Sequence, residues 1–157
     1  MILNQQNYLP HRGRMCLIDS ILEVNEKCAR CQTLITKNNI FYNPQIDGIY
    51  AWMGLEFMAQ TAGIFAYFND HSRENITNIE PKIGFLLSVR KFSCSQPHFK
   101  ANDLLTIIAD NEYLQDNLGV FQCSIILNDK LVAAAKLNAL QPSAEELKNT
   151  MFDFLTS

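Results

Sequence analysis

The sequence has little charge, few glycines and prolines, and no long uninterrupted hydrophobic run. Charged residues make up 18% of its 157 residues, and it contains six glycines and five prolines. Disordered and low-complexity chains are usually rich in charge or in proline and glycine, so this composition excludes both classes. Hydrophobic residues reach 48%, which is enough to bury a sizeable core. The length predicts a single domain over residues 1–157.

Neither sign of charge is in large excess. Thirteen Lys and Arg against sixteen Asp and Glu leave a net charge of −3. A chain that binds nucleic acid through its whole surface usually has a clear excess of basic residues, so we expect no nucleic-acid partner. The first eight residues lack the basic flank and the apolar run of a signal peptide. We therefore expect a cytoplasmic protein.

Cysteines are few and odd in number, which argues against a disulfide framework. Five are present, and in a chain without an export signal free thiols are the expected state. Cys28 and Cys31 are the one close pair, in a segment that is typical of a strand. Residues three apart in a strand point to opposite faces, and no second Cys or His pair has zinc-ligand spacing. We expect no metal site.

The most apolar stretch, Ala51–Phe68, contains only three clearly polar residues: Glu56, Gln60 and Thr61. These residues and two glycines argue against a membrane span, which needs about 20 mostly apolar residues. A helix that is apolar all round is typical of the centre of a globular core. The sequence therefore predicts a buried central helix and no membrane partner.

Strand-like segments surround this helix in the sequence. We expect strands over Leu17–Glu26, Ala29–Ile35, Ile83–Cys94, Leu104–Tyr113, Val120–Leu127 and Leu131–Leu140. Asn38–Tyr50 is rich in Asn and contains Asp47-Gly48, which favours a loop. Residues 1–16 form an N-terminal segment, and the capping-box spacing of Ser143 and Glu146 predicts a short C-terminal helix over residues 143–157. The pattern predicts an α+β fold, with an antiparallel sheet of about six strands wrapped around one long central helix.

Three motifs in this order resemble the hotdog-fold 3-hydroxyacyl-(acyl carrier protein) dehydratases. They are Leu9-Pro10-His11-Arg12 followed by Met15–Asp19, then Gly54–Gln60 (GLEFMAQ), then Ile83–Phe92. The resemblance covers about residues 8–142. Within the family the chain is most similar to the branch found in aryl-polyene-type biosynthetic clusters, in Asp47-Gly48 before Ala51-Trp52 and in the closing Leu137–Pro142 (LNALQP).

The resemblance implies a hotdog fold and an acyl carrier protein as partner, with the substrate carried on phosphopantetheine and no cofactor. It also implies a homodimer, since that family pairs its sheets across a two-fold axis; a heterodimer or a higher oligomer stays open. It makes Glu56 the expected catalytic acid. Burial would raise the pKa of this carboxyl group, which suits a group that protonates a departing hydroxyl. Gln60, four residues after Glu56, is expected to bind the substrate or to orient Glu56.

The histidine pattern departs from the family. The fatty-acid enzymes carry a catalytic His fourteen residues before the Glu, and that position here is Tyr42. No His lies between residues 12 and 70. His11 is then the best candidate for the base that removes the α-proton, with a structural role in the N-terminal segment as the alternative. Tyr42 is expected to donate a hydrogen bond to the substrate.

Two further sets of residues are expected to bind substrate and carrier. The central helix begins near Ala51 and Trp52, and peptide N–H groups at a helix N-terminus favour the developing negative charge on a thioester oxygen. Arg12, Arg90 and Lys91 are expected to contact the acidic carrier protein and its phosphate, with scattered solvated charge as the alternative.

The predicted function is the dehydration of a 3-hydroxyacyl thioester on acyl carrier protein to the trans-2-enoyl thioester. An acyl thioesterase is one alternative, because hotdog thioesterases also place an acidic residue on the central helix. A catalytically silent hotdog subunit that binds acyl carrier protein is the other, because the loop His is missing.

Overall fold

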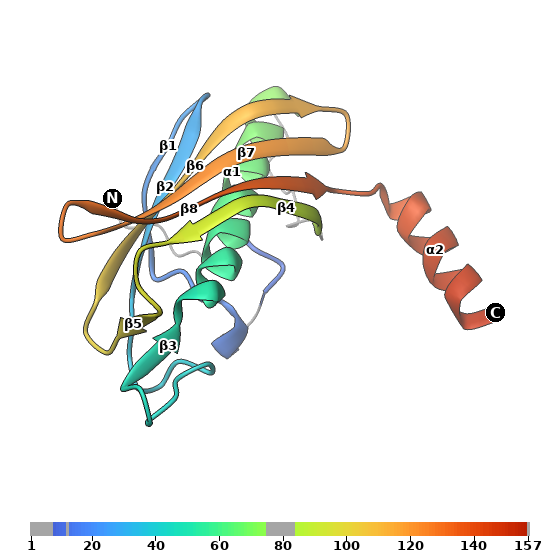
Figure 1. Ribbon diagram of the computed structural model, residues 1–157. Helices are drawn as coiled ribbons and strands as arrows, with labels where there is room; N and C mark the ends of the chain where they lie inside the picture. The colour runs from blue at the N-terminus through green and yellow to red at the C-terminus, as the bar shows by residue number, and fades with distance from the viewer. Residues whose placement is uncertain (1–7, 12, 75–83, 157) are drawn as a thin grey trace.

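The computed structural model describes residues 8–11, 13–74 and 84–156, and its main feature is a curved sheet around one helix (Figure 1). The helix is α1 (Gly54–Glu74). In sheet order the six antiparallel strands are β1 (Ser20–Val24), β2 (Cys28–Leu34), β6 (Leu104–Gln115), β7 (Leu118–Leu127), β8 (Lys130–Leu140) and β4 (Phe85–Cys94). This is the hotdog fold, and it confirms the predicted α+β architecture.

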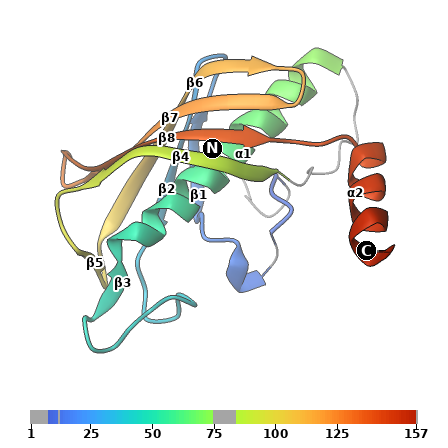
Figure 2. The same ribbon diagram turned by 45° about the vertical axis from the view of Figure 1, so that its right-hand side comes forward.

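The core lies between α1 and the face of the sheet that curves around it, as Figure 2 shows from a second side. Phe57, Met58, Ile64 and Phe65 of α1 are fully buried or nearly so, which confirms the prediction of a buried central helix. The inward residues of the sheet alternate with outward ones, as a half-buried strand requires. Those of the central strands include Cys31, Leu105, Ile107, Ala109, Phe121, Cys123 and Ile125.

Helix α1 begins later and ends later than the sequence indicated. A 3₁₀ turn, η3 (Ala51–Met53), precedes it, and the α-helix proper begins at Gly54. At the other end the helix continues to Glu74, although the apolar pattern ends at Phe68. A helix can continue past its apolar pattern, because each further residue adds a backbone hydrogen bond to a helix that has already formed. The later start places Glu56 in the first turn of α1 rather than in its middle.

A second, two-stranded sheet was not predicted. It pairs β3 (Gly48–Tyr50), inside the expected loop, with β5 (His98–Lys100). Three residues are too few to show the period-2 pattern from which a strand is inferred. The pairing requires glycine at position 48, since a Cβ there would clash with the Phe99 carbonyl oxygen. This small sheet fixes the chain that leads into α1.

The turns and the C-terminal helix follow the predicted local chemistry. Asn128 and Asp129 have positive φ and join β7 to β8 in a two-residue hairpin. Before α2 (Ala144–Thr156), the Glu146 carboxylate accepts from the Ser143 N–H and the Glu146 N–H donates to the Ser143 hydroxyl, which confirms the capping box. Figures 1 and 2 show α2 extending away from the sheet.

The cysteines are all free thiols, as predicted. Cys31 points into the core while Cys28 is only half-buried. Burial raises the pKa of Cys31 and of Cys123 to about 12, so both stay protonated at neutral pH. Within residues 8–11, 13–74 and 84–156, no group of three metal-ligating side chains is close enough to hold a metal ion, and no helix has the length and apolarity to cross a membrane.

Candidate active site

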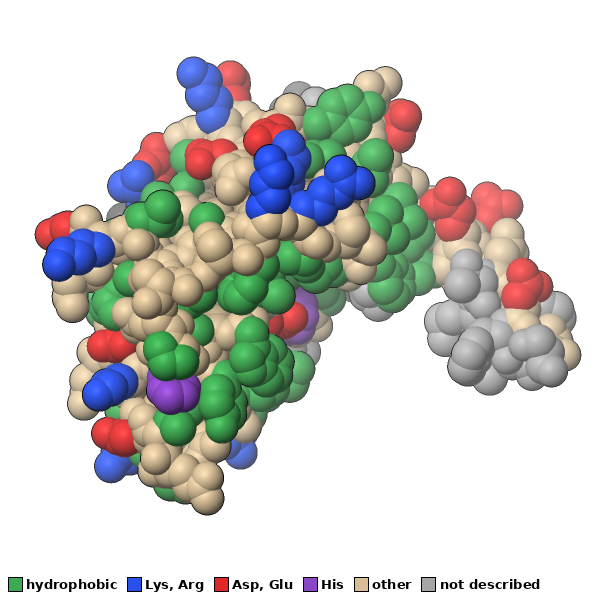
Figure 3. All heavy atoms as spheres, viewed as in Figure 1, with side chains coloured by type: hydrophobic (Ala, Val, Ile, Leu, Met, Phe, Trp, Pro, Cys, Tyr) green, Lys and Arg blue, Asp and Glu red, His purple; other side chains and the backbone are tan. Residues whose placement is uncertain are grey.

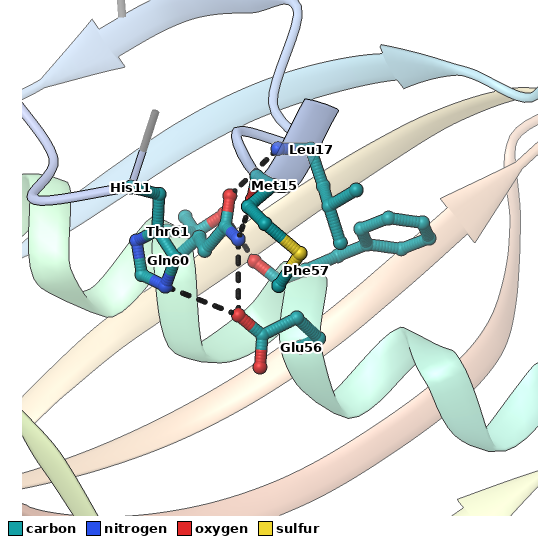
Figure 4. A network of polar contacts seen from close by, with 7 residues as sticks. All are labelled: His11, Met15, Leu17, Glu56, Phe57, Gln60 and Thr61. Carbon is teal, nitrogen blue, oxygen red and sulfur yellow. Dashed lines mark hydrogen bonds and ion pairs between the residues drawn. The ribbon is translucent and has the colours of Figure 1, made fainter. Parts of the chain in front are cut away.

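His11 and Glu56 meet where the N-terminal segment crosses the first turn of α1 (Figure 4). The distance between His11 Nε2 and Glu56 Oε1 is 3.4 Å, and the side chains are 32% and 35% exposed. The two residues that the sequence predicted as base and acid are therefore in contact, although 45 positions separate them. Both reach solvent, so a substrate can approach them.

Gln60 connects this pair to the backbone of the N-terminal segment. Its Nε2 donates to Glu56 Oε1 at 3.0 Å and to the Met15 carbonyl oxygen at 2.8 Å. Its Oε1 accepts from the Leu17 N–H at 2.9 Å. The side chain is only 1% exposed, and both ends of its amide are engaged by the protein. Of the two roles expected for Gln60, these contacts match the one in which it orients Glu56.

The pKa of Glu56 is shifted down, whereas the sequence predicted an upward shift. Partial burial raises it, but hydrogen bonds from His11 and Gln60 and the charge of His11 together lower it below the ordinary value of 4.5. The first turn of α1 adds a helix dipole that also favours the carboxylate. The expectation of a raised pKa assumed deep burial in an apolar helix without donors. In the free enzyme Glu56 is therefore ionised at neutral pH.

This shift makes a testable difference to stability. Because the pKa of Glu56 is lower in the folded chain than its ordinary value of 4.5, the ionised group stabilises the fold above that pH. The contribution is lost as the pH falls through the folded-state pKa. The difference in unfolding free energy between the wild type and Glu56→Gln should therefore shrink on acidification from about pH 6 to about pH 3, measured by denaturant unfolding. A difference that stays constant over this range would contradict the lowered pKa.

A groove of about 240 Å³ runs from His11 and Glu56 along α1. On α1 the groove is lined near Glu56 by small residues one turn apart, Ala59, Ala62, Gly63 and Ala66, and farther along by Tyr67, Asn69 and Asp70. The facing wall includes the apolar residues Phe121, Leu137 and Ala139 of β7 and β8, with Asp116 and Asn117 at the turn before β7. Figure 3 shows a histidine next to an acidic side chain on this face, with hydrophobic side chains around them. An apolar channel that begins at an acid–base pair is suited to an acyl chain.

The other predicted site residues lie elsewhere in this chain. Ala51, the first residue of η3, is buried. Trp52 is exposed beside Tyr50, with the two rings stacked 6.5 Å apart. The Tyr42 hydroxyl donates to Asp47 Oδ1 at 2.5 Å in an exposed loop, which raises the pKa of Tyr42. None of the three lines the groove.

Two of the three predicted carrier-binding residues lie in the described part of the chain. Arg90 and Lys91 lie on β4, where both are exposed. Arg12 falls outside the described residues. The apolar channel itself was not foreseen from the sequence, although small residues at positions 59, 62, 63 and 66 on one helical face could have indicated it.

Comparisons with known proteins place this geometry in context. The family model for ApeP dehydratases, ApeP-like, matches residues 3–151. A 3-hydroxyacyl-[acyl-carrier-protein] dehydratase FabZ of Chlamydia trachomatis is 27% identical over 148 residues, which cover 90% of this chain and 92% of that protein.

Two solved structures share the fold. The dehydratase heterocomplex ApeI:P from Xenorhabdus doucetiae superimposes with a TM-score of 0.87 at 24% identity, over 95% of this chain and 97% of that one. A hypothetical thioesterase from Streptococcus pneumoniae with coenzyme A gives a TM-score of 0.59 at 13% identity, over 79% of this chain and 85% of that one. Proteins with both names share this fold, so the fold alone does not choose between the two reactions.

Proposed function

This chain belongs to the ApeP-like dehydratase family, and from that premise we propose that His11 and Glu56 are its catalytic pair. The reaction is the dehydration of a 3-hydroxyacyl thioester on acyl carrier protein to the trans-2-enoyl thioester. The single observation that supports the pair is the 3.4 Å contact of His11 Nε2 with Glu56 Oε1 at the head of an apolar groove.

The chemistry requires one base and one acid on the same substrate. His11 takes the α-proton, the electron pair of that C–H bond forms the new double bond, and the C–O bond to the 3-hydroxyl breaks. Glu56 supplies a proton to the departing hydroxyl, which leaves as water. Two groups 3.4 Å apart can serve neighbouring carbons of one chain. Before the reaction the pair therefore holds one proton, on Glu56. After the reaction that carboxylate is ionised and His11 is protonated, and proton transfer from His11 to Glu56 restores the starting state.

The lowered pKa of Glu56 is compatible with an acid role once substrate is bound. In the free enzyme the carboxylate is about one third exposed and keeps part of its hydration. An acyl chain in the groove displaces water next to it, and desolvation raises the pKa of a carboxyl group. The first turn of α1 lies at the same place, so its dipole favours negative charge that develops on the thioester oxygen. We propose that no cofactor takes part beyond the phosphopantetheine that carries the substrate.

Product analysis tests this function and separates it from its alternatives. The purified chain is incubated with a 3-hydroxyacyl-acyl carrier protein, and the products are identified by mass spectrometry. We expect the enoyl thioester, 18 mass units lighter than the substrate by loss of water. Release of the free acid would identify a thioesterase instead. An unchanged substrate, with the carrier protein still bound, would identify a silent subunit.

We propose a second hotdog chain as the partner of β4. This ten-residue strand pairs with β8 on one side and forms the edge of the sheet on the other. Phe85, Leu86 and Leu87 are 48%, 44% and 56% exposed there, and an open apolar edge of this kind invites pairing with another strand. Phe85 and Leu86 also line the groove, so a subunit at this edge would complete its wall. A second copy gives a homodimer; a different dehydratase chain would give a heterocomplex.

Leu87→Lys should weaken this assembly, because a charge in place of the most exposed of these three apolar residues resists burial. We expect the variant to become monomeric at concentrations at which the wild type is dimeric, measured by light scattering after gel filtration. Leu131→Lys is the matched control, since Leu131 is 59% exposed but lies at the start of β8. A wild-type chain that is itself monomeric would contradict the homodimer.

Arg90 and Lys91 remain our proposal for the carrier-binding surface. Both are exposed on β4, the strand that also contributes Phe85 and Leu86 to the groove. Positive charge near the groove would attract an acidic carrier protein and the phosphate of its prosthetic group. Arg12 is the residue after His11 in the sequence and completes this proposed set.

A further inference from the structure

The segment that carries His11 is held against α1 on both sides of that residue. Before it, Leu9 is 1% exposed and lies over Gly63, where an added Cβ would come within 3.3 Å of Leu9 Cδ2. After it, the Gln60 amide binds the backbone at Met15 and Leu17. Tyr8, the residue before Leu9, also packs its ring against Tyr67 and Phe68 of α1. None of the described residues between Leu9 and Met15 belongs to a strand. These contacts with α1 hold the segment beside Glu56.

The second anchor and the acid share one side chain. Gln60 lies one helical turn after Glu56, and its Nε2 donates both to Glu56 Oε1 and to the Met15 carbonyl oxygen. Since a primary amide nitrogen has two hydrogens, one is available for each acceptor. Any displacement of the segment must disturb this amide, and any displacement of the amide must disturb the carboxylate. Among the described residues, His11 is the titratable group that shifts the pKa of Glu56.

We propose that Gln60 is a positioning residue of the reaction: through one buried amide it sets the distance between the segment bearing His11 and the carboxylate of Glu56. This inference rests on the proposed function of that pair. It assigns Gln60 no contact with substrate. Its effect is on the geometry of proton transfer, in which small misplacements of the reacting groups are costly.

Gln60→Met tests the proposal, because methionine has nearly the same length and volume but neither donates nor accepts a strong hydrogen bond. We expect kcat to fall about 10- to 100-fold with KM within about threefold, since the groove walls are unchanged. Loss of the donor should also raise the pKa of Glu56, because the Gln60 hydrogen bond helps to lower it. That pKa is measured by NMR from the side-chain carboxyl carbon of ¹³C-labelled protein, assigned by its absence in Glu56→Gln.

Thr61→Val is the matched control. Thr61 is the next residue of α1, is fully buried, and donates through its hydroxyl to the Phe57 carbonyl oxygen. Its replacement removes a buried hydrogen bond of the same helix without touching Glu56. We expect it to lower the melting temperature while leaving kcat and the titration of Glu56 as in the wild type.

Either of two results would overturn the proposal: a Gln60→Met enzyme whose kcat falls no further than that of Thr61→Val, or one in which Glu56 titrates as in the wild type. If Gln60→Met does not fold, Gln60→Glu replaces it. That side chain keeps an acceptor for the Leu17 N–H but places a second carboxyl group beside Glu56, and the same two changes are expected. The titration requires no substrate, so its result is independent of whether His11 and Glu56 prove to be catalytic.

Discussion

Glu56→Gln is expected to lower the rate of enoyl thioester formation by about 1,000-fold, within the range attributed to general acid–base catalysis. Glutamine keeps the volume of the side chain but cannot deliver a proton to the departing hydroxyl. The fold should survive, because the replaced group lies at the surface end of the groove and is one third exposed. The measurement is turnover of a 3-hydroxyacyl-acyl carrier protein, together with a melting curve for the same preparation.

Glu112→Gln is the matched control for this experiment. Glu112 forms an ion pair with Lys136 and does not line the groove. The same chemical change there removes a charge without touching the proposed site, so activity should stay near that of the wild type. A Glu56→Gln enzyme with near wild-type turnover would remove Glu56 from the mechanism.

His11→Ala is expected to cost at least about 100-fold in turnover, with little loss of melting temperature. The reason is that we propose His11 as the base beside Glu56, and that its side chain is 32% exposed rather than part of the core. The segment keeps its anchors at Leu9 and at Gln60, so it should stay in place without the imidazole. Both quantities are measured on the one variant.

A structural histidine would give the opposite pattern. Removal of His11 would then destabilise the chain strongly, while whatever protein stayed folded would keep its activity. His98→Ala is the control, since His98 lies on β5 beside Tyr50 and does not line the groove. The second pattern would leave the α-proton without a base in this chain, and would favour a site completed by another subunit.

The sequence by itself determined the architecture and the identity of the central pair. The apolar run around Phe57 and Phe65 predicted a helix at the centre of the core, and alternating patterns predicted the six main strands. The Ser143 capping box and the Asn128-Asp129 turn are local interactions within four residues, so their chemistry is complete in the sequence. Glu56 and His11 could be selected because the motifs containing them resemble those of one family of enzymes.

The tertiary structure alone decided how those residues work. The three-residue pairing of β3 with β5 and the 3₁₀ turn at Ala51–Met53 moved the start of α1 to Gly54, and so put Glu56 in its first turn. The lowered pKa of Glu56 depends on donors from His11 and Gln60, and the amide of Gln60 is engaged by backbone groups at Met15 and Leu17. The contacts of His11 with Glu56, and of Gln60 with Met15 and Leu17, join positions more than 40 residues apart. No local pattern encodes them, because hydrogen-bond geometry and desolvation are set by which segments the fold brings together.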